Sequence, residues 1–276
     1  MQNPEKYNYV IAGGDGFYKF AYSDLDKLDN VCFFRHYKEG VESNLMRLLI
    51  SINFNLKVNQ LIKTPLKSLT FPQIYPHGFG KERPLCFIFF GAQYAVINTS
   101  YIEYLRKRYP DARLVLYMQD VVRSLPYYDI QNYKRRFDLV LSYDRGDCDN
   151  YSLTYYPTPF SHIDVSKLKS ETPVDIYFCG SAKSRYPEIF DAFRKAKDEG
   201  LSCRFFITGV PDHKRIISDD IIYDRKLSYI ENLSHAASAK CILEVMQKDA
   251  DGFTPRLWEA MTLNKHLLTN NSALKE

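Results

Sequence analysis

Short apolar runs alternate with longer segments of helical periodicity along the first half of the chain. Apolar runs bounded by turn-forming residues are typical of buried strands. We expect these strands at residues 9–12, 31–34, 85–90, 113–118 and 138–143. The clearest helices between them are expected at residues 43–60 and 100–108. In the first helix, Leu45, Leu48 and Ile52 recur at helical spacing. This alternation predicts a parallel sheet that is covered on both faces.

A proline-containing segment, residues 155–173, interrupts the alternation, and we interpret it as a linker between two domains. Further strands are expected at residues 175–179, 204–208, 221–223, 241–246 and 266–269, and helices at 187–199, 230–239 and 255–263. The predicted fold class is therefore α/β, with two Rossmann-like βαβ domains at residues 1–160 and 174–276. Because the last expected strand lies close to Glu276, the sequence leaves open whether the second domain is naturally short or truncated.

The composition is that of a soluble globular protein, with 45% hydrophobic and 25% charged residues. A formal net charge of +4 permits an anionic ligand without requiring one. No two of the six cysteines have CxxC spacing, which favours reduced thiols over disulfides or zinc. The polar N-terminus lacks a signal-peptide core, and no apolar stretch approaches the roughly 20 residues that span a bilayer. We therefore expect a cytoplasmic protein.

The most informative motif lies between an expected strand and an expected helix and reads Asp251-Gly-Phe-Thr-Pro-Arg-Leu-Trp-Glu259. Thr254 is a good N-cap, and Gly252 lets a ligand approach the backbone closely. The amide groups of residues 253–256 would then point toward an anion. Open α/β sheets bind ligands at this kind of place, beyond the carboxyl end of a parallel strand.

An acidic residue, seven residues and a glutamate resemble the E-x7-E signature of GT-B glycosyltransferases. The residues that follow, Ala-Met-Thr-Leu-Asn-Lys-His-Leu-Leu-Thr-Asn, are similar to a segment of bacterial lipopolysaccharide and capsule transferases. The resemblance implies that Asp251, a candidate catalytic residue, contacts sugar hydroxyls. It implies that Glu259 binds the ribose hydroxyls of a nucleotide. It also implies that Arg256 and the amides of Phe253 and Thr254 neutralise a diphosphate.

Simpler interpretations stay open for the same residues. Asp251 would also favour the N-terminus of a helix, and Glu259 would pair with Arg256 three residues before it. Asp251 stands where the family has glutamate, and Asn264 stands where glycine is usual. A non-catalytic relative that binds a saccharide or a partner transferase is therefore one alternative.

A second candidate donor-binding element reads Gly180-Ser-Ala-Lys-Ser-Arg185 and follows the first expected strand of the second half. Gly180 and Ser181 can form a tight turn against a phosphate, and Lys183 or Arg185 can reach its oxygens. GT-B donor domains resemble this arrangement of a strand ending in glycine with basic residues after it. A solvated turn is the simpler alternative.

Glycines and aspartates also end strands in the first half. Gly13, Gly14 and Asp15 follow the first expected strand, and we interpret them as part of an acceptor cleft. They do not form the GxGxxG fingerprint of dinucleotide enzymes. Asp120 and Asp144 each end an apolar strand and are further candidate catalytic residues, either of them as the base of an inverting reaction. Surface capping explains both equally well.

Three short acidic pairs leave a metal-dependent alternative open. Asp-x-Asp sequences begin at Asp24, Asp147 and Asp249, and in GT-A glycosyltransferases such a pair holds a metal ion on the donor diphosphate. We expect no metal and no other cofactor, because arginine or lysine side chains and helix amides would stabilise the departing diphosphate.

Basic and aromatic residues interleave at residues 101–109 and 133–137. On a helix they would rest on an anionic membrane that carries a lipid-linked acceptor, or they would form a solvated helix face. Peripheral contact with the inner face of a membrane is therefore left open.

These observations and the resemblance predict a glycosyltransferase of cell-surface polysaccharide synthesis. The second domain would bind a nucleoside diphosphate sugar, and the first would bind a saccharide or lipid-linked acceptor. No nucleic-acid partner is expected. The alternatives are a metal-dependent GT-A-type enzyme of nucleotide sugars and a non-catalytic GT-B-like binding protein.

Overall fold

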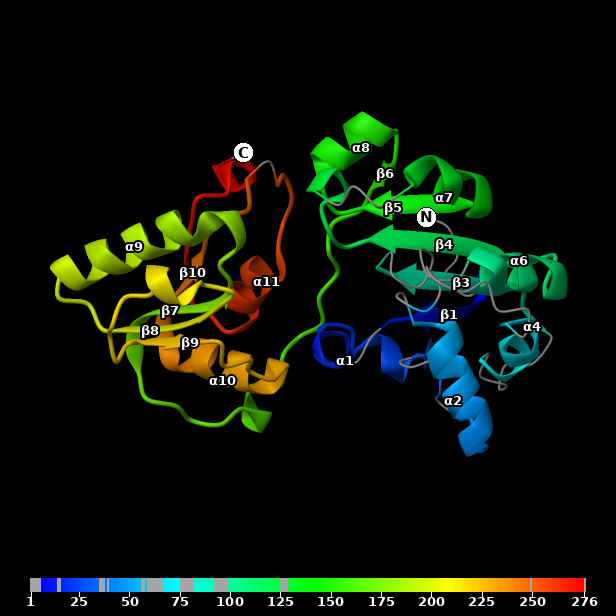
Figure 1. Ribbon diagram of the computed structural model, residues 1–276, viewed down its shortest axis with the longest axis horizontal. Helices are drawn as coiled ribbons and strands as arrows, with labels where there is room; N and C mark the ends of the chain where they lie inside the picture. The colour runs from blue at the N-terminus through cyan, green and yellow to red at the C-terminus, as the bar shows by residue number, and fades with distance from the viewer. Residues whose placement is uncertain are drawn as a thin grey trace. The chain divides into compact units, whose positions relative to one another are not determined.

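The chain forms two compact units in a computed structural model, Met1–Pro157 and Thr158–Glu276 (Figure 1). The structure describes residues 6–13, 16–34, 38, 40–55, 58, 67–74, 82–91, 99–124, 129–248 and 250–275. Among the described residues, each unit has its own parallel sheet, of six strands in the first and five in the second. The predicted class of two Rossmann-like α/β domains is therefore confirmed.

The sheet of the first unit is parallel throughout and has the strand order β2-β1-β3-β4-β5-β6. Its strands are β1 (Asn8–Ala12), β2 (Val31–Phe34), β3 (Leu85–Phe90), β4 (Arg113–Met118), β5 (Leu139–Ser142) and β6 (Thr154–Tyr155). The helices described in this unit are α1 (Phe17–Ala21), α2 (Asn44–Asn53), α4 (Lys67–Thr70), α6 (Thr99–Arg108), α7 (Ile130–Arg136) and α8 (Arg145–Tyr151).

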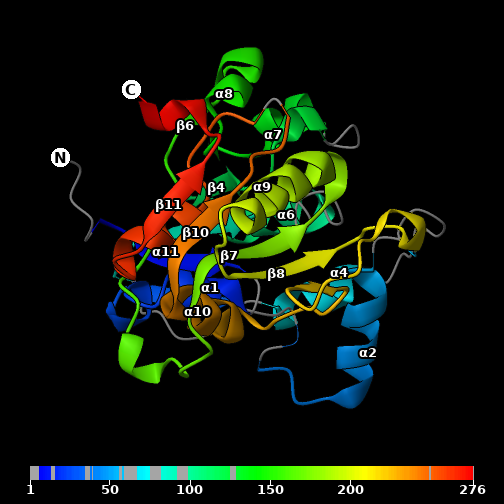
Figure 2. The ribbon, with the colours of Figure 1, turned by 90° about the vertical axis from the view of Figure 1, so that its left-hand side faces the viewer.

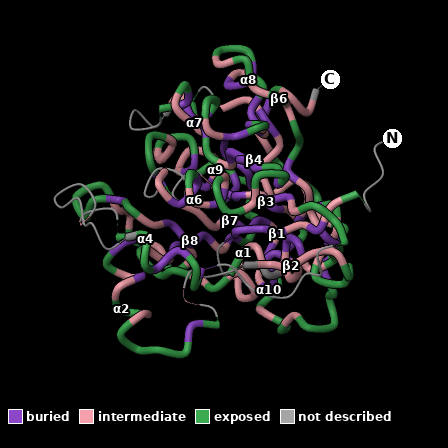
Figure 3. Tube along the Cα trace, turned by 90° about the vertical axis from the view of Figure 1, so that its right-hand side faces the viewer, coloured by how far each residue is buried: buried purple, intermediate pink, exposed green. Residues whose placement is uncertain are grey.

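The central strands of this sheet are buried on both faces, which explains why they read as continuous apolar runs. In β4, Leu114, Leu116 and Met118 are fully buried, and the alternate residues Val115 and Tyr117 are also buried. Figure 3 shows β3 and β4 as mostly buried trace within this unit. Burial on both faces is what made these strand bounds predictable from hydrophobicity alone.

The second unit has the strand order β11-β10-β7-β8-β9, again with all neighbours parallel. Its strands are β7 (Val174–Ser181), β8 (Cys203–Thr208), β9 (Ile221–Tyr223), β10 (Ala239–Glu244) and β11 (His266–Thr269). Its helices are α9 (Tyr186–Asp198), α10 (Tyr229–Ser238) and α11 (Pro255–Thr262), with α9 on one face of the sheet and α10 and α11 on the other (Figures 1 and 2).

Successive residues of β7 serve two separate cores, because neighbouring side chains of a strand point to opposite faces. Phe178 packs with Ile189 of α9, whereas Tyr177 packs with Leu233 of α10 and Ala260 of α11. The two clusters hold the helices against the sheet and so fix where each helix begins at its carboxyl edge.

The strand order reverses between β7 and β10. From β7 the chain adds β8 and β9 on one side, and it then returns to place β10 and β11 on the other. At such a reversal the loops after the two central strands diverge to opposite faces, which leaves room for a ligand beyond their carboxyl ends. In the first unit the corresponding reversal lies between β1 and β3.

The segment predicted as a linker is largely part of the second unit. The division between the units falls at Pro157, but Thr158, Ser161 and Ile163 are buried. The backbone amides of Lys169 and Glu171 donate to serine hydroxyls of α10. The prolines and the polar run predicted a linker between domains, whereas hydroxyls of a helix distant in sequence bind these two amides of the segment.

Several element bounds differ from the predicted ones, and those of β10 and α2 differ at two residues or more. The strand expected at residues 241–246 begins and ends two residues earlier, as β10, because Ala239 already pairs with Val174. The helix expected at residues 43–60 begins as predicted, with Ser43 as its N-cap, but α2 ends at Asn53.

No helix in the described part of the chain is both long and apolar enough to cross a bilayer.

Candidate functional site

The candidate site lies in the second unit, at the carboxyl ends of β7 and β10 where the strand order reverses. Gly180 and Ser181 are the last residues of β7, and Glu244 is the last residue of β10. The predicted tight turn at Gly180 and Ser181 is wrong, because both residues still pair with β8. Thr254 caps α11 with its hydroxyl, as predicted, by accepting from the amide of Arg256.

Two guanidinium groups converge on Gly180. A Cβ atom placed on this glycine would lie 2.9 Å from Nη2 of Arg256 and 3.3 Å from Nη2 of Arg185. Arg256 comes from the first turn of α11, and Arg185 directly precedes α9, so the two side chains come from helices on opposite faces of the sheet. A side chain at this position would have to displace the two guanidinium groups, which glycine leaves in place.

Backbone carbonyls hold both arginines in place. Arg256 donates to the carbonyl of Cys179 and lies over the Phe178 ring, with 5.6 Å to the ring centroid. Arg185 donates from Nε and Nη2 to the carbonyl of Ser181, each at 3.2 Å, and from Nη1 to the carbonyl of Val245. Among the described residues, neither guanidinium forms an ion pair with a carboxylate.

This arrangement concentrates positive charge at a partly desolvated position. Burial, followed by the neighbouring charge of Arg256, lowers the pKa of Arg185 to about 10, and the charge of Glu244 opposes that shift. Two like charges held together with no carboxylate in direct contact favour a bound anion, and arginine recognises phosphate oxygens with paired donors. The site can therefore hold a phosphate or diphosphate group.

Glu244 organises the loops around this site, although it was not among the residues predicted from the sequence. Its side chain is 1% exposed and accepts hydrogen bonds from the hydroxyls of Thr254 and Thr269, the latter at 2.6 Å. It thus ties the end of β10 to the N-cap of α11 and to the end of β11. A lone carboxylate within the apolar run of residues 241–246 was the available signal.

Glu259 is 5% exposed and lies one turn after Arg256 in α11. The simpler interpretation of an exposed ion pair between them is wrong, because Glu259 accepts from the hydroxyl of Tyr229 at 2.7 Å and forms no ion pair among the described residues. Burial raises the pKa of Glu259, while the charge of Arg256 and hydrogen bonds from Tyr229 and Asn232 lower it. A carboxylate near a phosphate site can accept hydrogen bonds from ligand hydroxyls.

The other predicted donor-binding residues surround this centre. Lys183 is exposed and donates to Oε1 of Gln247 at 3.3 Å, so Arg185 rather than Lys183 meets Gly180. The backbone carbonyl of Gly252 accepts from Asn271 at 2.9 Å. Phe253 accepts through its carbonyl from Thr158 at 3.3 Å. Asp251 is half-buried in the same loop.

Two of the cavities among the described residues border the second unit's sheet. A polar one of about 290 Å³ has Arg185, Gln247 and Asn270 in its wall, and so adjoins the arginine pair. The larger one, of about 650 Å³, is mainly apolar and lies between α9 and the strands β10 and β11. We place the site at the arginine pair rather than at the larger cavity, because the cations and buried carboxylates gather there.

The predicted acceptor residues of the first unit are only partly described. Gly13 lies directly after β1, and a Cβ atom there would be 3.2 Å from the Phe90 ring and 3.5 Å from the Tyr18 ring. This packing accounts for the glycine without a ligand. Gly14 and Asp15 lie outside the described residues. Asp120 is exposed after β4, as expected for a strand-end residue.

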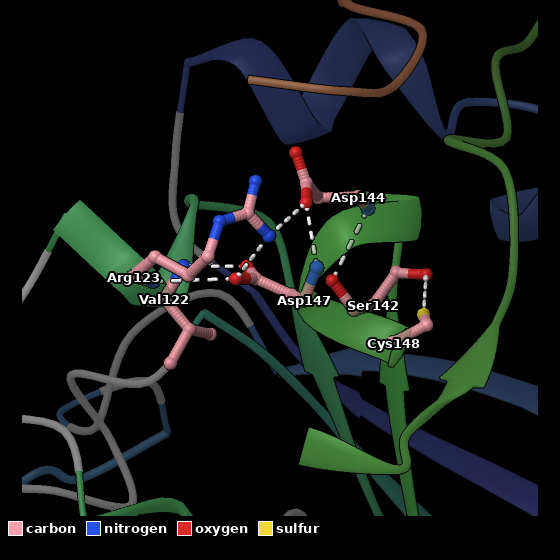
Figure 4. Close-up of polar contacts among 6 residues, drawn as sticks. All are labelled: Val122, Arg123, Ser142, Asp144, Asp147 and Cys148. Carbon is pink, nitrogen blue, oxygen red and sulfur yellow. Dashed lines mark hydrogen bonds and ion pairs between the residues drawn. The ribbon is translucent and has the colours of Figure 1, made fainter. Parts of the chain in front are cut away.

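Asp144 is buried in a cluster rather than exposed as a surface cap (Figure 4). It caps α8 by accepting from the amide of Asp147 at 2.8 Å, and Nη1 of Arg123 lies 2.7 Å from its carboxylate and 2.8 Å from that of Asp147. Gly146 leaves room for this guanidinium, since a Cβ atom there would be 2.6 Å from Nη1. The geometry gives Asp144 a structural role, and its predicted catalytic role stays a prediction.

The acidic pairs do not assemble a metal site in the described part of the chain, where no three His, Cys, Asp or Glu side chains gather as ligands. Asp24 pairs with Lys27 at 2.6 Å, and Asp147 is held by Arg123. Asp249 lies outside the described residues. The six cysteines, which all lie among the described residues, form no disulfide with one another.

Comparisons with known proteins identify the fold. No family model and no curated protein matches the chain. The chain is similar to the structure of an alpha-glucosyltransferase in complex with UDP-glucose and DNA containing an abasic site, with 12% identity, a TM-score of 0.53, and coverage of 96% of this chain and 80% of that one.

It is also similar to a trehalose-6-phosphate synthase, with 11% identity, a TM-score of 0.52, and coverage of 98% and 86%. An alpha,alpha-trehalose 6-phosphate synthase from Burkholderia multivorans matches at 9% identity, a TM-score of 0.52 and the same coverage. At these identities the likeness establishes the fold, the two-domain GT-B architecture.

The Arg123 cluster predicts a large loss of stability on removal of its cation. Arg123→Met would leave two buried carboxylates without a counterion, so we expect a loss of about 3–5 kcal/mol in the free energy of unfolding, measured by urea denaturation. Arg194→Met, which breaks an exposed pair with Asp191, is the control and should have little effect. Equal effects of the two substitutions would contradict a structural role for the cluster.

The pKa of Glu259 predicts a pH-dependent effect of Glu259→Gln on stability. Because burial raises this pKa above its unfolded value, the folded state is penalised as the pH rises from the unfolded pKa to the folded one. Relative to the parent, Glu259→Gln should therefore become more stable between pH 4 and pH 7, as measured by urea denaturation.

A matched control has the opposite sign. Ser228 lowers the pKa of Glu231 in the capping box of α10, so Glu231→Gln should lose stability relative to the parent over the same pH range. If both variants changed in the same direction with pH, the assignment of Glu259 as a buried, penalised carboxylate would be wrong.

Proposed function

We propose that this chain is a glycosyltransferase whose second unit binds a nucleoside diphosphate sugar. The observation that carries the proposal is the convergence of Arg185 and Arg256 on Gly180 at the strand-order reversal. A diphosphate is the leaving group of such a donor. Two preorganised guanidinium groups would stabilise the charge that develops on it when the sugar departs.

The residues on α11 support a nucleotide rather than a simple phosphate. Arg256 and Glu259 lie one turn apart, so a cation for the diphosphate and an acceptor for ribose hydroxyls belong to one rigid helix. In this proposal Glu259 binds the ribose and Asp251, at the carboxyl edge, meets the sugar. Arg185, the amides of Phe253 and Thr254, and more distantly Lys183 complete the surroundings of the diphosphate.

The comparisons support the same class of reaction. One similar structure contains UDP-glucose bound to a glucosyltransferase, and two others are trehalose-6-phosphate synthases. From the resemblance of residues 260–270 to a segment of lipopolysaccharide and capsule transferases, we propose transfer to a saccharide or lipid-linked acceptor on the first unit, in cell-surface polysaccharide synthesis. One of these structures also contains DNA, so the likeness gives no support to the expected absence of a nucleic-acid partner. Asp120 is the more accessible candidate base, since Asp144 is paired with Arg123.

The arginine pair predicts how nucleotide binding depends on Arg256. Arg256→Ala removes a charge-assisted contact worth about 1.5–3 kcal/mol, so UDP or GDP should bind roughly ten- to a hundredfold more weakly in calorimetric titrations. The free nucleoside should lose much less, because Arg256 would contact phosphate.

A second variant tests the convergence itself. Gly180→Ala keeps both charges but places a methyl group against the two guanidinium groups. Like Arg256→Ala, it should weaken the binding of UDP or GDP. Arg194→Ala on the exposed side of α9 is the control. If both site variants bound nucleoside diphosphates as tightly as the parent, no diphosphate site would exist at Gly180.

The proposal also predicts independence from divalent metals. Because arginines and helix amides would stabilise the diphosphate, binding and release of nucleotide from a donor sugar should persist in excess EDTA. A strict requirement for Mg²⁺ or Mn²⁺ would favour the metal-dependent alternative. Binding of nucleotide sugars without any transfer or hydrolysis would favour a non-catalytic binding protein.

A further inference from the structure

The carboxylate of Glu259 is held by side chains of a different helix. Tyr229 is the first residue of α10 and donates its hydroxyl to Oε1 of Glu259 at 2.7 Å. Asn232, three residues later on the same face of α10, also faces Glu259, and its hydrogen bonding lowers the pKa of that carboxylate. Two neutral side chains of α10 are thus hydrogen-bond donors to one buried carboxylate on α11.

A third residue fixes the orientation of Asn232. The hydroxyl of Tyr177, which is 2% exposed in β7, donates to Oδ1 of Asn232 at 3.0 Å. With its oxygen accepting from Tyr177, the amide turns its nitrogen toward other acceptors. The start of α10 is itself fixed by the reciprocal capping box of Ser228 and Glu231. Glu259 therefore meets donors that are rigidly placed.

These two donors do not use the full hydrogen-bonding capacity of the Glu259 carboxylate. An ionised carboxyl group can accept about four hydrogen bonds, and burial without a cationic partner is costly. Glu259 has no ion-pair partner among the described residues, although Arg256 lies one turn away. Tyr229 occupies one side of Oε1, so acceptor capacity is left for a ligand with adjacent hydroxyls.

We propose that Tyr229 and Asn232 are positioning residues that make the site selective for ribonucleotides over 2′-deoxyribonucleotides. They hold Glu259 ionised and oriented so that it receives the 2′- and 3′-hydroxyls of a ribose. The inference rests on the proposed function, because it assumes that a nucleoside diphosphate occupies the site. Tyr229 acts through Glu259 and does not itself contact the reacting atoms.

The test compares UDP with 2′-deoxy-UDP, and GDP with 2′-deoxy-GDP, by calorimetric titration. The parent should bind the ribose form at least about tenfold more tightly than the deoxyribose form, because one hydrogen bond to a charged group changes the affinity by about that factor. In Tyr229→Phe this preference should fall to less than about threefold. The loss should come from weaker binding of the ribose form, with the deoxy form nearly unchanged.

A pH profile separates positioning from a general structural effect. Removing the Tyr229 hydroxyl takes away a hydrogen bond that lowers the pKa of Glu259, so this pKa should rise in Tyr229→Phe. Because the proposed binding of ribose needs the ionised carboxylate, UDP binding should weaken at a higher pH in Tyr229→Phe than in the parent as the pH is lowered. Tyr186→Phe on α9 is the matched control, because it also removes a hydroxyl that donates to the chain, here to the Lys214 carbonyl at 3.0 Å. It should change neither the preference nor the profile.

The ways in which the test can fail are distinguishable. If the parent binds UDP or GDP but Tyr229→Phe keeps the full preference for ribose, the positioning role is wrong and the proposed function stands. The positioning role is equally wrong if the parent binds the ribose and deoxyribose forms with the same affinity. If the folded parent, verified by cooperative thermal unfolding, binds no nucleoside diphosphate, the proposed function fails and this inference fails with it.

Discussion

Two arginines held against each other at Gly180 are the constraint on which the rest of the second unit's carboxyl edge depends. Their charges repel, and burial makes the repulsion stronger than it would be in water. Carbonyl groups of Cys179, Ser181 and Val245 hold them there instead of carboxylates. Hydrogen bonds to neutral carbonyls fix the position of a guanidinium without cancelling its charge. The positive charge at this edge of the sheet can therefore attract an anion.

The fold produces this convergence by bringing together distant parts of the chain. Arg185 follows β7, and Arg256 follows β10, which the sheet places beside β7 only after the chain has built the opposite edge. The two loops lead to helices on different faces of the sheet, and the two guanidinium groups meet beside Gly180. Glu244, between Thr254 and Thr269, sets the course of the second loop and therefore where Arg256 begins its helix.

The sequence predicted the bounds of β2, β3, β4, β9 and β11 because each is a short apolar run, and the central strands β3 and β4 are apolar throughout because they are buried on both faces. It also indicated the motif from Asp251 to Glu259, since capping chemistry is local. It could not predict non-local pairings. The partner of Glu259 is Tyr229 on another helix, Asp144 pairs with Arg123, and serines of α10 bind the supposed linker. Such contacts depend on the folded topology and leave no mark on spacing.

Two buried carboxylates show how a structural role differs from a functional one in this chain. Asp144 has a guanidinium at 2.7 Å and caps a helix, so its charge is compensated within the protein. Glu259 is nearly as buried, yet the hydrogen bonds that it accepts come from neutral donors. No ion-pair partner among the described residues neutralises its charge, and burial raises its pKa. Folding alone gives no reason to retain that cost, because a neutral residue of the same shape would avoid it. A ligand that brings hydroxyl groups to Glu259 and phosphates to Arg256, one turn away, and to Arg185 would explain why the charge is kept.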